Sequence, residues 1–143
     1  MNFKARAVFA LLLVAPAVPA CDSLRADHGW IRLPPPNAKF AAAYFTLLNT
    51  GATKIEVTGV SSPAFGHAML HETRYVDGHA EMRHLERIEL DPGASFVAAP
   101  GGAHVMLGEA REPLEPDRFI EIMLQCSAGA PLSLWLPVSR TAP

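Results

Sequence analysis

The sequence predicts an all-β protein with a Greek-key sandwich or barrel architecture. Its apolar segments are short and rich in β-branched and aromatic residues, and Gly, Pro, Asn and Asp separate them at intervals that suit such folds. No segment has the periodicity of a long amphipathic helix. The chain has 143 residues, of which 50% are hydrophobic, so it is long enough for one domain with its own core.

The first 20 residues have the pattern of a secretory signal peptide. Lys4 and Arg6 precede the apolar run AVFALLLVA, which is too short to span a bilayer comfortably, and small residues at 18–20 suit cleavage. We therefore expect 1–20 to be removed and 21–143 to form a single exported β domain, located in a bacterial periplasm. No later segment is long and apolar enough to cross a membrane.

The first three strands are expected at 28–33, 40–49 and 54–61. Three prolines at 34–36 stiffen the connection between the first two, and an Asn-Thr-Gly turn follows the second. The second strand has an alternative, because the three consecutive alanines at 41–43 would also suit a helix.

A β-hairpin is expected next, with strands at 68–76 and 79–85 around the turn sequence Asp77-Gly78. This turn sets three cross-strand pairs: Val76 with His79, Thr73 with Met82, and His71 with His84. His71 and Met82 are then diagonal neighbours on one face, within reach of a common ion. A bulge or a loop of odd length would reverse this parity.

The remaining strands are expected at 86–90, 95–98, 104–108, 118–126 and 131–138. Asp-Pro-Gly at 91–93 and Glu-Pro-Asp at 115–117 are turn sequences between them. The stretch APGGAHVMLG, residues 99–108, places a Pro-Gly-Gly turn before a strand that opens near His104. His104 and Met106 share a face because side chains alternate along a strand.

Two cysteines, Cys21 and Cys126, follow the signal peptide, and three fates are open to them. Export favours a disulfide, which would tie the mature N-terminus to a late strand. Cys21 also stands directly after the cleavage site, where a lipoprotein carries its lipid, although Pro19 fits that motif poorly. Free thiols are the third possibility. Membrane contact is expected only if Cys21 is lipidated.

Composition and residue pattern argue against several function classes. The formal net charge is −2 and no basic patch is present, so we expect no nucleic-acid partner. The sequence offers no paired carboxylates, no activated Ser or Cys and no open zinc triad. We therefore expect that the protein is not an enzyme and has no catalytic residues.

Histidine and methionine are concentrated in one part of the chain. Five of the six histidines, and three of the four methionines after the signal peptide, lie between positions 67 and 106. They are His67, Met69, His71, His79, Met82, His84, His104 and Met106. Each of them alone also suits ordinary packing or a solvated surface. His79 falls on the face opposite Met82.

A metal site follows if the His71 and Met82 face meets the His104 and Met106 face. Thioether sulfur is a soft ligand that selects Cu(I), and imidazole also suits copper. Mg²⁺ and Ca²⁺ require oxygen ligands, which this set lacks, and structural zinc more usually has thiolates. Cu(I) is the best chemical match.

The spacing His-x10-Met-x21-His-x-Met, with His71, Met82, His104 and Met106, resembles the motif of the periplasmic copper chaperone family PCuAC. The resemblance extends over residues 28–138. It includes the flanking segments GWIRLPPP, AAAYFTLLNTG, SSPAFGHAMLHET, VDGHAEMR and PGGAHVML.

This resemblance implies a cupredoxin-like Greek-key β-barrel with one Cu(I) per chain, held near the surface by the four motif residues. It also implies a role in carrying copper and delivering it to a cuproprotein, namely the dinuclear copper centre in the copper subunit of cytochrome c oxidase. A second, thiol-containing copper chaperone is an implied partner. His67, Met69 and His84 lie outside the motif and are candidates for supporting or weak additional ligands. Binding is expected to weaken below about pH 6.5, where free imidazole becomes protonated.

Two other functions compete with this interpretation. An electron-transfer cupredoxin needs a Cys thiolate with two His and an axial Met, but no His or Met follows Cys126. A non-metal β-sandwich interaction module, in which the His and Met cluster is incidental, is the second alternative.

Overall fold

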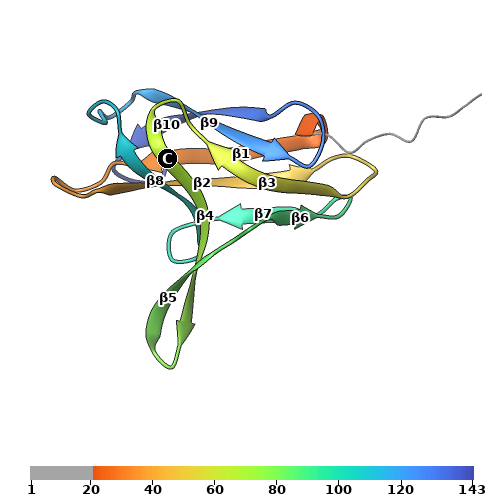
Figure 1. Ribbon diagram of the computed structural model, residues 1–143, viewed down its shortest axis with the longest axis horizontal. Coiled ribbons are helices and arrows are strands. Elements are labelled where there is room, and N and C mark those ends of the chain that lie inside the picture. Colours follow the sequence, from red (N-terminus) through yellow and green to blue (C-terminus); the bar gives the residue numbers. More distant parts are fainter. Residues whose placement is uncertain (1–20) are drawn as a thin grey trace, which may run out of the picture.

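The computed structural model describes residues 21–143, which form ten strands after one short 3₁₀ turn (Figure 1). The expected signal peptide lies outside the described residues. The elements are η1 (Cys21–Ser23), β1 (Leu24–Arg32), β2 (Phe40–Asn49), β3 (Ile55–Ser61), β4 (Phe65–Val76), β5 (His79–His84), β6 (Ile88–Leu90), β7 (Ser95–Ala98), β8 (Ala103–Ala110), β9 (Phe119–Cys126) and β10 (Leu132–Ser139). The all-β prediction is confirmed, and all ten predicted strands are present.

The strands form one continuous sheet in the order β5-β4-β8-β7-β2-β1-β10-β9-β3-β6. Most neighbours are antiparallel, while β1 with β10 and β7 with β8 are parallel. The sheet curls back on itself, so that β3 packs near β4 and β6 near β7. Figure 1 shows that the β4–β5 hairpin projects away from the rest of the molecule.

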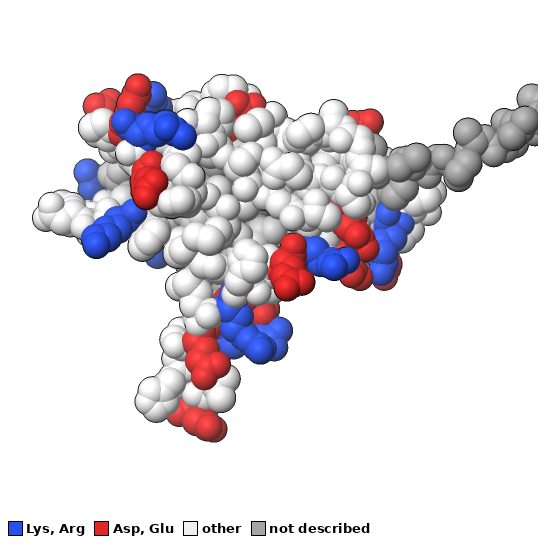
Figure 2. Space-filling view, viewed as in Figure 1, with Lys and Arg blue, Asp and Glu red and all other residues white. Residues whose placement is uncertain are grey.

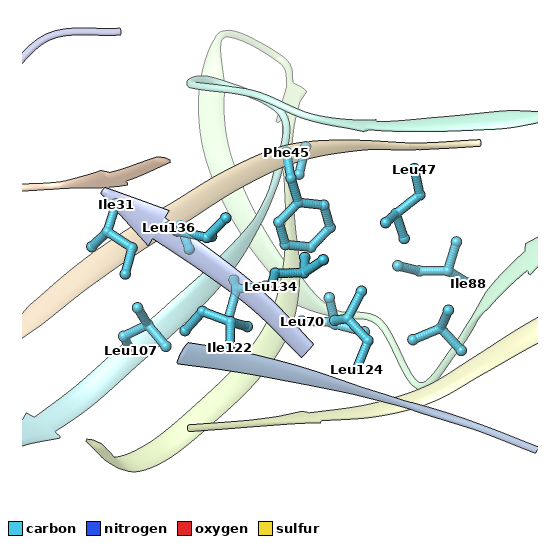
Figure 3. Packing of buried hydrophobic residues seen from close by; sticks show 14 of the residues in the cluster. Ile31, Phe45, Leu47, Leu70, Ile88, Leu107, Ile122, Leu124, Leu134 and Leu136 are labelled. Atoms are coloured by element: carbon cyan, nitrogen blue, oxygen red, sulfur yellow. The ribbon is translucent and has the colours of Figure 1, made fainter. Parts of the chain in front are cut away.

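The core lies between the facing halves of the curled sheet. Phe45 and Leu47 of β2 and Ile122 and Leu124 of β9 point into this interior and are almost fully buried (Figure 3). Burial of each such side chain contributes about 1.5–3 kcal/mol. The alternation of buried and exposed positions along β9 is the pattern of a strand with one face in the core.

The alanines at 41–43 lie in a strand, as predicted, and not in a helix. Ala41 and Ala43 are buried, whereas Ala42 lies on the other face, opposite Met106. Pairing in the sheet outweighs the helix propensity of these alanines, because β2 is a central strand that pairs with β1, β7 and β8.

β1 begins at Leu24, four residues before the start expected from the sequence. Its ladder with β2 shifts register between Asp27 and Trp30, and His28 has a positive φ of 54°. This bulge interrupts the period-two pattern, and the strand start expected from the sequence, at 28, lies within it.

The predicted hairpin register is confirmed at every position. Asp77 and Gly78 have φ values of 49° and 80°, as a two-residue type I′ turn requires. The observed pairs include Val76 with His79, Thr73 with Met82 and His71 with His84. All six residues of β5 are exposed.

Cys21 and Cys126 form a disulfide with a Cα–Cα distance of 5.7 Å, which joins η1 to the end of β9. Of the three fates considered from the sequence, the structure shows the disulfide. In this structure the Cys21 sulfur is bonded to that of Cys126. Among residues 21–143, no helix is long and apolar enough to cross a membrane.

Candidate metal centre

Three neighbouring strands bring three imidazoles into a row. His71 of β4 lies directly opposite His84 of β5 on one side and directly opposite His104 of β8 on the other. The ring centroid of His71 is 5.7 Å from that of His84 and 6.0 Å from that of His104. Paired residues share a face of a sheet, so all three side chains belong to the same face.

Methionines extend this row on the same face. Met69 of β4 is paired with Met106 of β8, and Met82 of β5 is paired with Thr73. The alternate residues Leu70 and Val105 are buried in the core, so the His and Met residues occupy the outward face. The structure therefore places His71 and Met82 on the same surface as His104 and Met106, because β4 pairs with both β5 and β8.

Three of the four predicted ligands line one pocket, of about 330 Å³, between the β4–β5 hairpin and β2. They are Met82, His104 and Met106. His71 is not in the wall of this pocket and adjoins it through His104. Met82 is 57% exposed, so the pocket is open to solvent on the side of the hairpin.

The hydrogen bond of His104 leaves one of its nitrogens free to bind a metal. Its Nδ1 lies 3.1 Å from the backbone carbonyl oxygen of Gly102. A carbonyl oxygen only accepts, so Nδ1 carries the proton and the lone pair is on Nε2. A tight turn places the Gly102 carbonyl beside His104. In this turn Gly101 has a φ of 82°, and the Gly102 N–H donates to the Ala99 carbonyl.

The surroundings of His71 favour the neutral form of its imidazole. Its Nδ1 is buried and has no hydrogen-bond partner among the described residues. Burial is the main cause that lowers the pKa of His71 below its usual value of 6.5, and the charges of protonated His104 and His84 lower it further. A neutral imidazole with an unsatisfied nitrogen suits a metal ligand.

The donors of this centre are soft. Among residues 21–143, no group of three or more His, Cys, Asp or Glu side chains is arranged to hold a metal ion. The methionines on this face are therefore the further donors to consider. Both cysteines are in the disulfide, so no thiolate is available within the described residues.

Two other histidines of the cluster have separate surroundings. His67 Nε2 lies 3.2 Å from a carboxylate oxygen of Glu109. Nδ1 of His79 donates to the backbone carbonyl of Asp77 at 3.1 Å, in the hairpin turn, and its side chain lies on the face opposite Met82 as predicted.

On the face drawn in Figure 2, acidic and basic side chains are interspersed.

The sequence reasoning missed the residues that build the far wall of the pocket. Arg32, Phe40 and Tyr44 line it together with Ala42. The Arg32 guanidinium carbon lies 5.7 Å from the centroid of the Tyr44 ring and 5.5 Å from that of Trp30. The segments GWIRL and FAAAY contain these residues, but no spacing rule connects them to the His and Met cluster.

The comparisons with known proteins agree with this fold. The family described as "Putative lipoprotein LpqE-like" matches residues 24–138. A curated relative from Leifsonia xyli subsp. xyli (strain CTCB07), described as "Putative lipoprotein Lxx21020", is 29% identical over 118 residues, which cover 82% of this chain and 70% of the relative.

Solved structures of PCuAC domains have the same architecture. The apo PCuAC domain from PmoF1 superposes with a TM-score of 0.69 at 25% identity, covering 83% of this chain and 95% of that one. The solution structure of CuI-DR1885 from Deinococcus radiodurans gives a TM-score of 0.65 at 26% identity, covering 88% and 82%. The cupredoxin-like all-β fold class is confirmed, and the chain belongs to the LpqE-like family.

Proposed function

We propose that this protein is a copper chaperone that binds one Cu(I) through His71, Met82, His104 and Met106. The observation that carries the proposal is the placement of two imidazoles and two thioethers on one outward face, with three of the four side chains in one open pocket. The likeness to CuI-DR1885, a protein described with Cu(I), supports it.

The chemistry of the donors favours Cu(I) over other ions. Thioether sulfur is soft and uncharged, and it discriminates against Zn²⁺, Mg²⁺ and Ca²⁺. An electron-transfer centre of the blue-copper type requires a Cys thiolate. The sulfur of Cys126 is bonded to Cys21, which argues against that alternative.

The exposure of the site suits a carrier. Met82 lies on the projecting hairpin and is largely exposed, so a partner protein can reach the ion and replace ligands one at a time. Thioethers and neutral imidazoles hold Cu(I) less firmly than thiolates would, which favours release. In this proposal the protein carries out no catalysis, and copper is its cargo.

The acceptor is proposed from the family resemblance. We expect delivery to the dinuclear copper centre of cytochrome c oxidase, with a second, thiol-containing chaperone as a further partner. The disulfide and the lipoprotein names of the family and of the curated relative support export. The periplasm is the proposed compartment, with the Cys21 sulfur in the disulfide.

A competition titration against a Cu(I) chelator tests the proposal. We expect one Cu(I) per chain and, in Met82→Leu or His104→Ala, a loss of affinity of at least about tenfold with the fold retained. His79→Ala is the matched control, because His79 lies on the opposite face of the same hairpin. Unchanged affinity in both variants would contradict the assignment. If Cu(I) also left the melting temperature of the wild-type protein unchanged, a non-metal interaction module would be favoured.

A further inference from the structure

We propose that Met69 and His84 form a second, weaker position for the same soft metal ion, and that His71 is shared between the two positions. This inference rests on the proposed function, because it concerns where the cargo ion is held next to the four motif residues. The ion occupies one position at a time, so the stoichiometry remains one per chain.

The two imidazoles that flank His71 each line a pocket, although His71 itself lies in the wall of neither. His104 lines the first, together with Met82 and Met106. His84 lines the second, which has a volume of about 140 Å³ and lies between β3 and the base of the β4–β5 hairpin, and Met69 lies in its wall. His71 is thus placed between the imidazole of one pocket and the imidazole of the other.

His71 lies at nearly the same ring-centroid distance from His84 as from His104. A metal–nitrogen bond is about 2 Å long, so two imidazoles on one ion have ring centroids separated by at most roughly 6 Å. The separation is 5.7 Å to His84 and 6.0 Å to His104. His84 is exposed, and side-chain rotation can therefore direct its nitrogen toward the ion.

The donors of the second position are of the same chemical class as those of the first. Met69 supplies one thioether, and His71 and His84 supply two imidazoles. One fewer thioether means weaker retention of Cu(I), because thioether sulfur supplies the softness of the site. The second position therefore suits transient occupancy.

Charge favours the second position for an ion that arrives from solvent. Its wall includes the carboxylate residue Glu86, whereas the wall of the first pocket includes Arg32. A cation is attracted by the first of these charges and repelled by the second. We infer that Cu(I) is held at Met69 and His84 on its way to or from the motif residues.

Cu(I) and Ag(I), each added alone to the purified protein, test this position. In the double variant Met82→Leu/Met106→Leu we expect weaker binding that persists and that shifts the Cε methyl resonance of Met69. Adding Met69→Leu and His84→Ala to that variant should reduce the remaining affinity at least about tenfold. Adding Met123→Leu and His79→Ala instead is the matched control and should not, because Met123 lies on β9 and His79 on the opposite face.

The outcomes separate the two proposals. Absence of any residual binding in the double variant, or residual binding that is insensitive to Met69 and His84, would overturn the second position and leave the proposed function intact. Wild-type affinity in the double variant would overturn the proposed function, and the second position with it. Circular dichroism on every variant verifies that it is folded.

Discussion

His71 and His104 lie directly opposite each other on β4 and β8, with their ring centroids 6.0 Å apart. His104 donates its Nδ1 proton to the Gly102 carbonyl, whereas the buried Nδ1 of His71 has no hydrogen-bond partner among the described residues. A hydrogen bond thus fixes the orientation of the His104 ring, whereas Nδ1 of His71 has no such partner. This arrangement leads to the following predictions.

The stability of the metal-free protein should fall as the pH is lowered through about 6.5. Burial lowers the pKa of His71 in the folded state, so the unfolded chain binds more protons in this range and acid favours unfolding. Above the unfolded pKa, both states have neutral His71 and no penalty arises. Urea unfolding at pH 7.5 and pH 5 should show this loss in the wild-type protein and a smaller one in His71→Gln. Equal losses in the two proteins would contradict the prediction.

The same lowered pKa should extend copper binding toward acid pH. Because its pKa is lowered, His71 becomes protonated, and the proton so competes with the metal, only at a pH below the pKa of a free imidazole. Titration of Cu(I) affinity between pH 7.5 and 5 should show a decline that begins below about pH 6.5. A decline complete above that pH would show that the environment of His71 does not protect it from protonation.

Gly78→Ala should destabilise the hairpin and weaken metal binding through Met82. Gly78 has a φ of 80°, where a side chain costs about 1–2 kcal/mol, although the space around it is open. Gly102→Ala is the control, because Gly102 does not have a positive φ and a methyl group there would lie 3.7 Å from its nearest neighbour, the Ala99 carbonyl oxygen. Amide hydrogen exchange should show faster exchange in β4 and β5 only for Gly78→Ala, and the same rates in both variants would contradict this.

Removal of the disulfide should reduce stability without abolishing the metal site. Cys21→Ser/Cys126→Ser is expected to lose about 2–5 kcal/mol of unfolding free energy, because the bond closes a long loop. The ligand set lies on β4, β5 and β8, whereas the disulfide joins η1 to β9. Denaturant unfolding and Cu(I) competition on the same variant separate the two effects. A large loss of Cu(I) affinity in a folded variant would contradict the independence of the two features.

The sequence was sufficient to predict most of the arrangement of the candidate site. Asp77-Gly78 determines a two-residue turn, and the turn determines the faces of His71 and Met82. The alternation of side chains likewise places His104 and Met106 together. These are local rules, and they remain valid because no bulge interrupts the β4–β5 hairpin.

Other features depend on contacts between distant segments and could not be derived in this way. The pairing of β4 with β8, which unites the two half-sites, is a long-range contact. The position of Arg32 and Tyr44 across the pocket depends on how β1 and β2 pack beside β8. The fate of Cys21 was open because a disulfide and a lipid anchor use the same sulfur, and the disulfide depends on the long-range packing of η1 beside β9.

X-ray absorption spectroscopy of the Cu(I)-loaded protein at neutral pH tests the central claim most directly. The proposed function predicts a Cu(I) edge with a first coordination shell of two sulfur and two nitrogen atoms, and the loss of one sulfur in Met82→Leu. A shell of nitrogen and oxygen atoms alone, or sulfur ligation unchanged by Met82→Leu and by Met106→Leu, would contradict it.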